Sequence, residues 1–96
     1  MASLRDIKKD INYLCGEVIY DCYMAMYFNS EKKDEILKII EEDVNLRNEM
    51  IEMANHPAEK HNPSLVRKHY RFVRSELMER IDGLFEKLSN IVNAQA

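Results

Sequence analysis

Glycine and proline are scarce in this chain, which has two of each among 96 residues and no tryptophan. So few turn-forming residues cannot supply the many tight turns of a β-sandwich or barrel. The abundant Glu, Lys, Leu, Ile and Met residues favour helices instead. The sequence also lacks any apolar run near the roughly 20 residues that cross a bilayer. These absences predict an all-α protein without a membrane-spanning segment.

Composition limits the size and the partners of the expected fold. The chain is 46% hydrophobic and 32% charged, which predicts a single globular domain over residues 1–96 with one modest core. The net charge of −3 argues against wholesale binding to nucleic acid or to a membrane surface. No basic and apolar leader-like segment opens the sequence, so we expect a cytoplasmic protein.

Polar residues and prolines mark the expected ends of three helices. Ser3 and Asp6 have the spacing of a capping box. Ser30 can cap a second helix, and Asn62 followed by Pro63 is typical of a helix start. Pro57 ends the helix before it, since proline lacks an N–H group. The expected helices cover residues 4–28, 31–54 and 63–92.

Three helices of similar length joined by short loops predict an elongated up-down-up bundle. Gly83 leaves two alternatives open in the third helix, because a helix-interior glycine costs about 1 kcal/mol and can also mark a kink or a break. We expect a continuous helix.

Each helix carries an apolar stripe at helical spacing. On the first helix the stripe comprises Leu4, Ile7, Ile11, Leu14, Cys15, Val18, Cys22 and Met26. On the second we expect Ile36, Leu37, Ile40, Val44, Ile51 and Ala54, with Ile39 and Met50 at the edge. The third carries Val66, Tyr70, Val73, Leu77, Ile81, Leu84, Leu88 and Ile91.

The first helix is apolar on its opposite side as well. The interface residues expected there are Tyr13, Gly16, Tyr20, Met24 and Tyr27, of which Gly16 lies at the flank, as does Tyr23. A helix that is apolar all round is normally buried all round. We therefore predict that this second face contacts another copy of the chain in a homo-oligomer, most simply a dimer. The alternative is that the third helix, or its segment after Gly83, covers the face within one chain.

Arg47 falls near the centre of the apolar stripe expected on the second helix. A charge that faces a core must be paired, because an isolated buried ion costs several kcal/mol. Asp43 lies one turn earlier, and the antiparallel arrangement brings Glu17 opposite. We predict a structural ion pair of Arg47 with Asp43 or Glu17; the alternative is a small ligand pocket at this place.

The third helix begins with a basic segment that contains interleaved aromatic residues. Arg67, Lys68, Arg71 and Arg74 could bind phosphates or another anion. The acidic residues of the second helix are expected to neutralise much of this charge within the molecule. We therefore expect a solvated or paired helix face here, with anion binding, nucleic-acid binding or protein docking as the alternatives.

No pattern in the sequence predicts a catalytic site, a metal site or a cofactor. Cys15 and Cys22 lie about 10 Å apart along one helix, beyond the reach of a disulfide. His56, His61 and His69 lack the Glu-x-x-His spacing of carboxylate-bridged metal bundles. No nucleophile and base stand at helical spacing, so we expect a non-enzymatic protein.

Several segments resemble small all-helical bacterial proteins of a family of unknown function. The segments are Ile7-Lys8-Lys9-Asp10-Ile11-Asn12-Tyr13-Leu14, Arg47-Asn48-Glu49 with Asn55-His56-Pro57, Asn62-Pro63 with Tyr70, and Ile81-Asp82-Gly83-Leu84-Phe85-Glu86-Lys87-Leu88. The resemblance implies a helical fold and a bacterial cytoplasmic origin, and it implies no active site. The functional expectation is a homo-oligomeric interaction or scaffold module, and the alternative is a module that binds an anionic ligand or nucleic acid.

Overall fold

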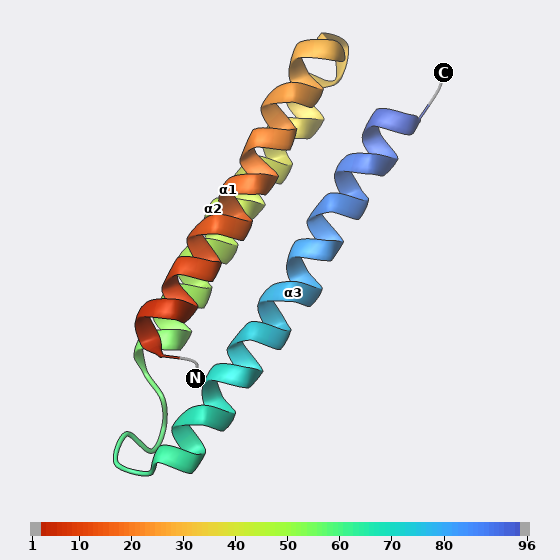
Figure 1. The fold of residues 1–96 in the computed structure, drawn as a ribbon. Helices are drawn as coiled ribbons and strands as arrows, with labels where there is room; N and C mark the ends of the chain where they lie inside the picture. The colour runs from red at the N-terminus through yellow and green to blue at the C-terminus, as the bar shows by residue number, and fades with distance from the viewer. Residues whose placement is uncertain (1–2, 95–96) are drawn as a thin grey trace.

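A computed structural model describes residues 3–94, which form three helices, each antiparallel to the one before it in the chain (Figure 1). Helix α1 spans Leu4–Phe28, α2 spans Lys33–Asn55 and α3 spans Pro63–Asn93. A short 3-10 helix, η1, covers Ser30–Lys32 between α1 and α2. The chain runs up, down and up, and the bundle measures 54 × 19 × 17 Å. The expected all-α three-helix bundle is confirmed.

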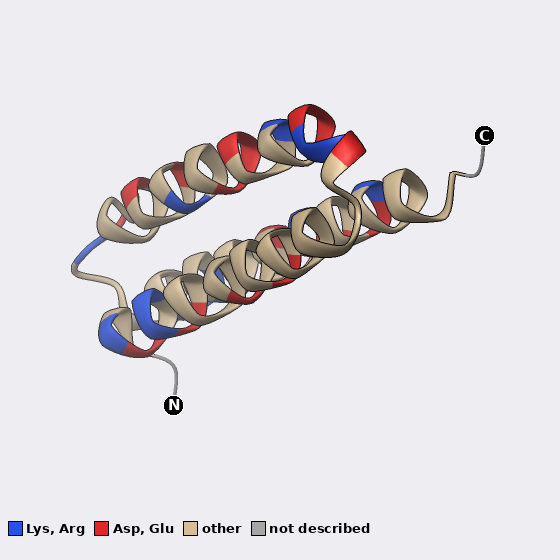
Figure 2. Cartoon of the chain, turned by 90° about the horizontal axis from the view of Figure 1, so that it is seen from above, with Lys and Arg blue, Asp and Glu red and all other residues tan. Residues whose placement is uncertain are grey.

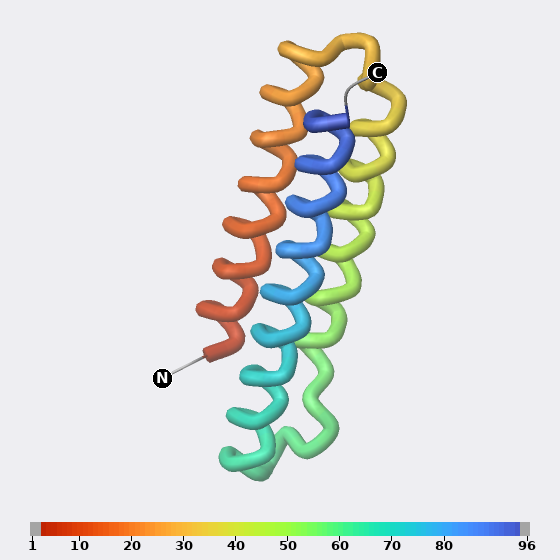
Figure 3. Tube along the Cα trace, turned by 90° about the vertical axis from the view of Figure 1, so that its right-hand side faces the viewer, coloured from red at the N-terminus to blue at the C-terminus, as the bar shows by residue number. Residues whose placement is uncertain are grey.

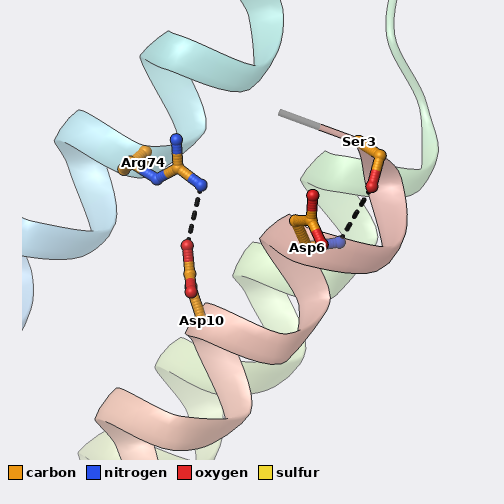
Figure 4. Close-up of polar contacts among 4 residues, drawn as sticks. All are labelled: Ser3, Asp6, Asp10 and Arg74. Atoms are coloured by element: carbon orange, nitrogen blue, oxygen red, sulfur yellow. Dashed lines mark hydrogen bonds and ion pairs between the residues drawn. The ribbon is translucent and has the colours of Figure 1, made fainter. Parts of the chain in front are cut away.

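The predicted caps begin α1 and α3. The Asp6 N–H donates a hydrogen bond of 3.2 Å to the Ser3 hydroxyl (Figure 4). The Asn62 side-chain oxygen accepts bonds of 3.1 and 3.3 Å from the N–H groups of Ser64 and Leu65. These bonds satisfy backbone donors that the first turn of a helix otherwise leaves without partners.

The first connection differs from the sequence-based expectation. Ser30 does not cap α2, because residues 30–32 form the 3-10 turn and α2 begins at Lys33 without a side-chain cap. The turn brings the Lys32 ammonium to the end of α3, where it donates to the carbonyl oxygens of Ile91, at 2.7 Å, and of Ala94. Lys32 thereby satisfies free carbonyls at a C-terminal helix end.

Helix α3 continues through Gly83 without a break, so the expected continuity is confirmed. Gly83 does not adopt a positive φ. Its helical neighbours Ile81 and Leu84 stay in the core on either side. The alternative of a fourth short helix is therefore wrong.

The three helices lie around one common core, each in contact with the other two, and α3 lies in front of α2 in the side view (Figure 3). The stripes expected on α1 and α3 are confirmed at their centres. Helix α1 buries Ile7, Ile11, Cys15, Val18 and Cys22, and α3 buries Tyr70, Val73, Leu77, Ile81, Leu84 and Leu88.

Helix α2 is rotated relative to the expected stripe. Leu37 and Val44 are each 42% exposed, although apolar spacing predicts both in the core. The expected Ile36 and Ala54 are buried, but between them the buried stripe runs through Ile39, Asp43, Leu46 and Met50, at spacings of three or four residues. This rotation places a carboxyl group in the core and turns Arg47 toward solvent.

Candidate interaction surface on helix α1

The apolar second face of α1 points away from the rest of the bundle. We call its residues Tyr13, Gly16, Tyr20, Met24 and Tyr27 the tyrosine face. All five are exposed, and the exposed fraction reaches 66% for Tyr13 and 80% for Tyr27. The core residues of α1 lie on the opposite side of the helix, where α2 and α3 pack. The alternative that α3 covers this face within the chain is therefore wrong for residues 3–94.

Two further aromatic residues enlarge the tyrosine face. Tyr23 is 59% exposed and Phe28 is 70% exposed. The rings of Tyr27 and Phe28 meet edge to face, with their centroids 5.1 Å apart. The sequence pattern places Tyr23 only at the flank and does not include Phe28. The sequence feature that could have identified both residues is the uncharged segment 22–28 at the end of α1. Its three aromatic side chains are all exposed.

Charge is distributed unevenly along α1. Its basic residues all fall in the first two turns, and no charged residue of the helix follows Asp21 (Figure 2). Beside the uncharged last turns, a groove of about 440 Å³ runs between α1 and α3. Its lining includes the apolar Met24, Phe28 and Phe85 and the polar Asp21, Asn29, Ser89 and Asn93. The last turns of α1 thus present an apolar surface to solvent.

Gly16 lies in the middle of the tyrosine face and has open space above it. A Cβ atom placed there would meet no heavy atom within 4 Å, apart from its own helix backbone, among the described residues. Glycine inside a helix costs about 1 kcal/mol relative to alanine. Packing within the described chain gives no reason for a glycine at this position.

The ion pair predicted for Arg47 does not form. Arg47 is exposed, and its guanidinium donates to the side-chain oxygens of Asn12, at 2.8 Å, and Asn48, at 3.2 Å. Glu17 is also exposed and forms no ion pair among residues 3–94. Both predicted partnerships are wrong: the rotation of α2 buries Asp43 and leaves Arg47 exposed, and Glu17 is exposed on α1.

The charged residue that the structure buries in the core is Asp43, and not Arg47. Its exposed fraction is 0%, and neither carboxyl oxygen has a hydrogen-bond partner among the described residues. Burial raises the pKa of Asp43 from 3.8 to about 6, with a smaller opposing effect from the neighbouring Cys15 thiol. The cause is desolvation, which disfavours the charged carboxylate.

The two cysteines next to Asp43 are buried and free. Burial raises the pKa of the Cys15 thiol to about 12, and the negative charge of Asp43 adds to the rise. The pKa of Cys22 rises to about 11 for the same reasons. Because the thiolate is the reactive form, both side chains are inert core residues near neutral pH.

The basic segment of α3 is only partly neutralised. Arg74 forms a 2.7 Å ion pair with Asp10 of α1 (Figure 4). Arg67, Lys68 and Arg71 are exposed and have no acidic partner within 4 Å among residues 3–94. The expectation that acids of α2 neutralise them is wrong.

Three acidic side chains of α2 have partners elsewhere. Two of them form ion pairs further along α3, Glu42 with Lys87 and Glu49 with Arg80. Glu52 instead contacts His56 at 3.2 Å on its own side of the second loop. The basic start of α3 lies beyond the reach of these carboxylates.

His69 connects α3 to α2 through a hydrogen bond. Its Nε2 lies 2.6 Å from the carbonyl oxygen of Met53, and because a carbonyl only accepts, this nitrogen carries the proton. The bond fastens α3 to the last turn of α2. Within the described part of the chain, no group of three or more His, Cys, Asp or Glu side chains could hold a metal ion.

Comparison with known proteins adds no assignment. No protein family, curated protein or solved structure matches this chain. Among residues 3–94, no helix combines the length and the apolar character needed to cross a bilayer.

Proposed function

We propose that this protein is a non-enzymatic interaction module that forms a homodimer through the tyrosine face of α1. The observation that carries the proposal is the exposure of this face in the folded chain. Soluble monomers rarely expose contiguous apolar patches larger than a few hundred Å², and larger patches are typical of interaction sites.

The size of the surface suits a stable dimer. At roughly 200 Å² for a fully exposed aromatic side chain, the four tyrosines and Phe28 present about 700 Å² at their observed exposures. A standard protein interface buries about 800 Å² on each partner. Met24 and the edges of the face supply the remaining area.

Tyrosine also suits an interface chemically. Its ring buries apolar area while its hydroxyl reaches water or a polar group at the rim. Tyrosine is enriched at interfaces, and Lys and Glu are depleted there. The uncharged last turns of α1 agree with this composition.

Sedimentation equilibrium over a range of concentrations tests the proposal. We expect a species of about twice the chain mass of 11.4 kDa, with dissociation to the monomer on dilution. A monomer at high micromolar concentration would contradict the proposed function.

A second candidate function rests on the unpaired basic residues of α3. Arg67, Lys68 and Arg71 lie on one exposed segment and could contact phosphate groups. If all three neutralise phosphates of duplex DNA, binding should weaken about 40-fold between 50 and 200 mM salt. A titration of generic duplex DNA at both salt concentrations tests this candidate, and absence of binding at 50 mM would exclude it.

A further inference from the structure

We propose that two copies of the chain pair along α1 in antiparallel orientation, with the two-fold axis between Gly16 and Tyr20. In this arrangement Tyr20 of each copy packs over Gly16 of the other. The inference rests on the proposed homodimer and adds the orientation and register of its two chains. It follows from the spacing of residues on the exposed side of α1.

The exposed side of α1 carries a coiled-coil repeat. Six exposed residues follow one another at spacings of 4, 3, 4, 3 and 4: Lys9, Tyr13, Gly16, Tyr20, Tyr23 and Tyr27. These spacings are those of the a and d positions of a heptad, whose side chains insert between side chains of a facing helix. The repeat lies opposite the buried residues of α1, so a second helix can approach without meeting α2 or α3.

Antiparallel pairing gives the glycine and the lysine of this repeat a tyrosine partner and pairs the two remaining tyrosines with each other. With the axis between Gly16 and Tyr20, each glycine faces a tyrosine of the second copy. Tyr13 then faces Tyr23 of the second copy, and Lys9 faces Tyr27. A tyrosine ring fills the open space above Gly16, where a Cβ atom would have no atom of the described chain within 4 Å beyond its own helix backbone.

Parallel pairing would match each residue with its own copy. Lys9 would then face Lys9, and like charges opposite each other are unfavourable. Gly16 would face Gly16 and leave a void, which an interface packed like a protein interior does not tolerate. The distribution of residue types therefore favours the antiparallel orientation.

Electrostatics favours the same orientation. Antiparallel pairing places the first turns of one α1, which carry Arg5, Lys8 and Lys9 as well as Asp6 and Asp10, beside the uncharged, aromatic last turns of the other. The Lys9 ammonium then lies over the ring of Tyr27 of the second copy, which is a cation–π contact. The opposed helix dipoles also attract each other, since each positive N-terminus lies beside a negative C-terminus.

Disulfide trapping tests the orientation. The test uses two variants of the full chain, Lys9→Cys and Tyr27→Cys, oxidised separately and as a mixture. In the proposed pairing the two copies of position 9 lie about 27 Å apart along the helix axis, and so do the two copies of position 27. A disulfide needs Cα atoms within about 7 Å. We therefore expect crosslinked dimer in the mixture and none with either variant by itself.

Matched controls exclude incidental crosslinking. Lys38 is exposed on α2 and does not belong to the tyrosine face. A thiol placed there by Lys38→Cys should not crosslink with either variant. The parent chain should not crosslink, because Cys15 and Cys22 are buried.

The outcomes separate this inference from the proposed function. Crosslinking of each variant by itself would indicate parallel pairing and overturn the inference, while the homodimer would stand. A dimer by sedimentation whose mixture does not crosslink would overturn the proposed orientation and register, while the homodimer itself would stand. A monomeric parent would overturn both.

Discussion

Asp43→Asn is expected to stabilise the chain by about 3 kcal/mol at pH 8, the cost of ionising a carboxyl whose pKa is raised from 3.8 to about 6. The asparagine amide has nearly the same shape as the protonated carboxyl and never ionises. For a domain of this size the gain corresponds to roughly 10–20 °C in Tm.

The effect of Asp43 has a definite dependence on pH. Below about pH 3.8 the carboxyl is protonated in both the folded and the unfolded chain. Between pH 3.8 and about 6 only the folded chain holds the proton, so stability falls as pH rises. Above about pH 6 the loss is complete. The stability advantage of Asp43→Asn over the parent should therefore grow as pH rises through this window. Above the window the advantage should stay constant.

Urea unfolding of the parent and of Asp43→Asn at pH 4 and pH 8 measures this difference. Asp82→Asn is a matched control, because Asp82 is exposed on α3 and carries the same change of charge. The control should leave the pH dependence of the parent unchanged. The two proteins differ in their free energy of unfolding, and this difference should be larger at pH 8 than at pH 4. An equal difference at the two pH values would contradict a raised pKa for Asp43.

The orientation of α2 is the part of the fold that periodicity predicts wrongly. Two apolar stripes overlap on this helix, and each contains one charged residue. One stripe has Arg47 near its centre, and the other contains Asp43 between Ile39 and Leu46. Apolar spacing does not choose between them, but ionisation chemistry does. A buried carboxyl can accept a proton at a modest cost, whereas a guanidinium stays charged in proteins.

The helices α1 and α3 are predictable because each has one unambiguous core stripe and clear caps. Their buried residues and the caps at Ser3 and Asn62 agree with the structure. The 3-10 turn at residues 30–32 is not predictable from local residue preference. It accompanies a contact of Lys32 with the distant end of α3, which no local pattern contains.

The tyrosine face is predictable as an apolar surface, but its exposure is not. The sequence leaves open whether α3 covers it, and the geometry of three helices decides the question. In a three-helix bundle, α2 and α3 both pack against one side of α1, so the opposite side stays open. A fourth helix would be needed to cover it, and a second copy of α1 can supply one.

Tyr20→Glu is expected to convert the dimer to a folded monomer and to raise the dimer dissociation constant at least about 100-fold. Tyr20 lies near the centre of the face and is 61% exposed in the single chain. Glutamate is tolerated there in the monomer. In the dimer its carboxylate would lose water without gaining a partner, a penalty of about 3 kcal/mol or more.

Sedimentation equilibrium and circular dichroism of Tyr20→Glu measure mass and helix content together. Ser75→Glu makes the same change of charge at an exposed site on α3 and should remain a dimer. Helix content should match the parent in both variants, because neither site belongs to the core. If Tyr20→Glu keeps the parent's dimer mass, the interface lies elsewhere. If it loses its helical structure, Tyr20 supports the fold itself and the face is no docking surface.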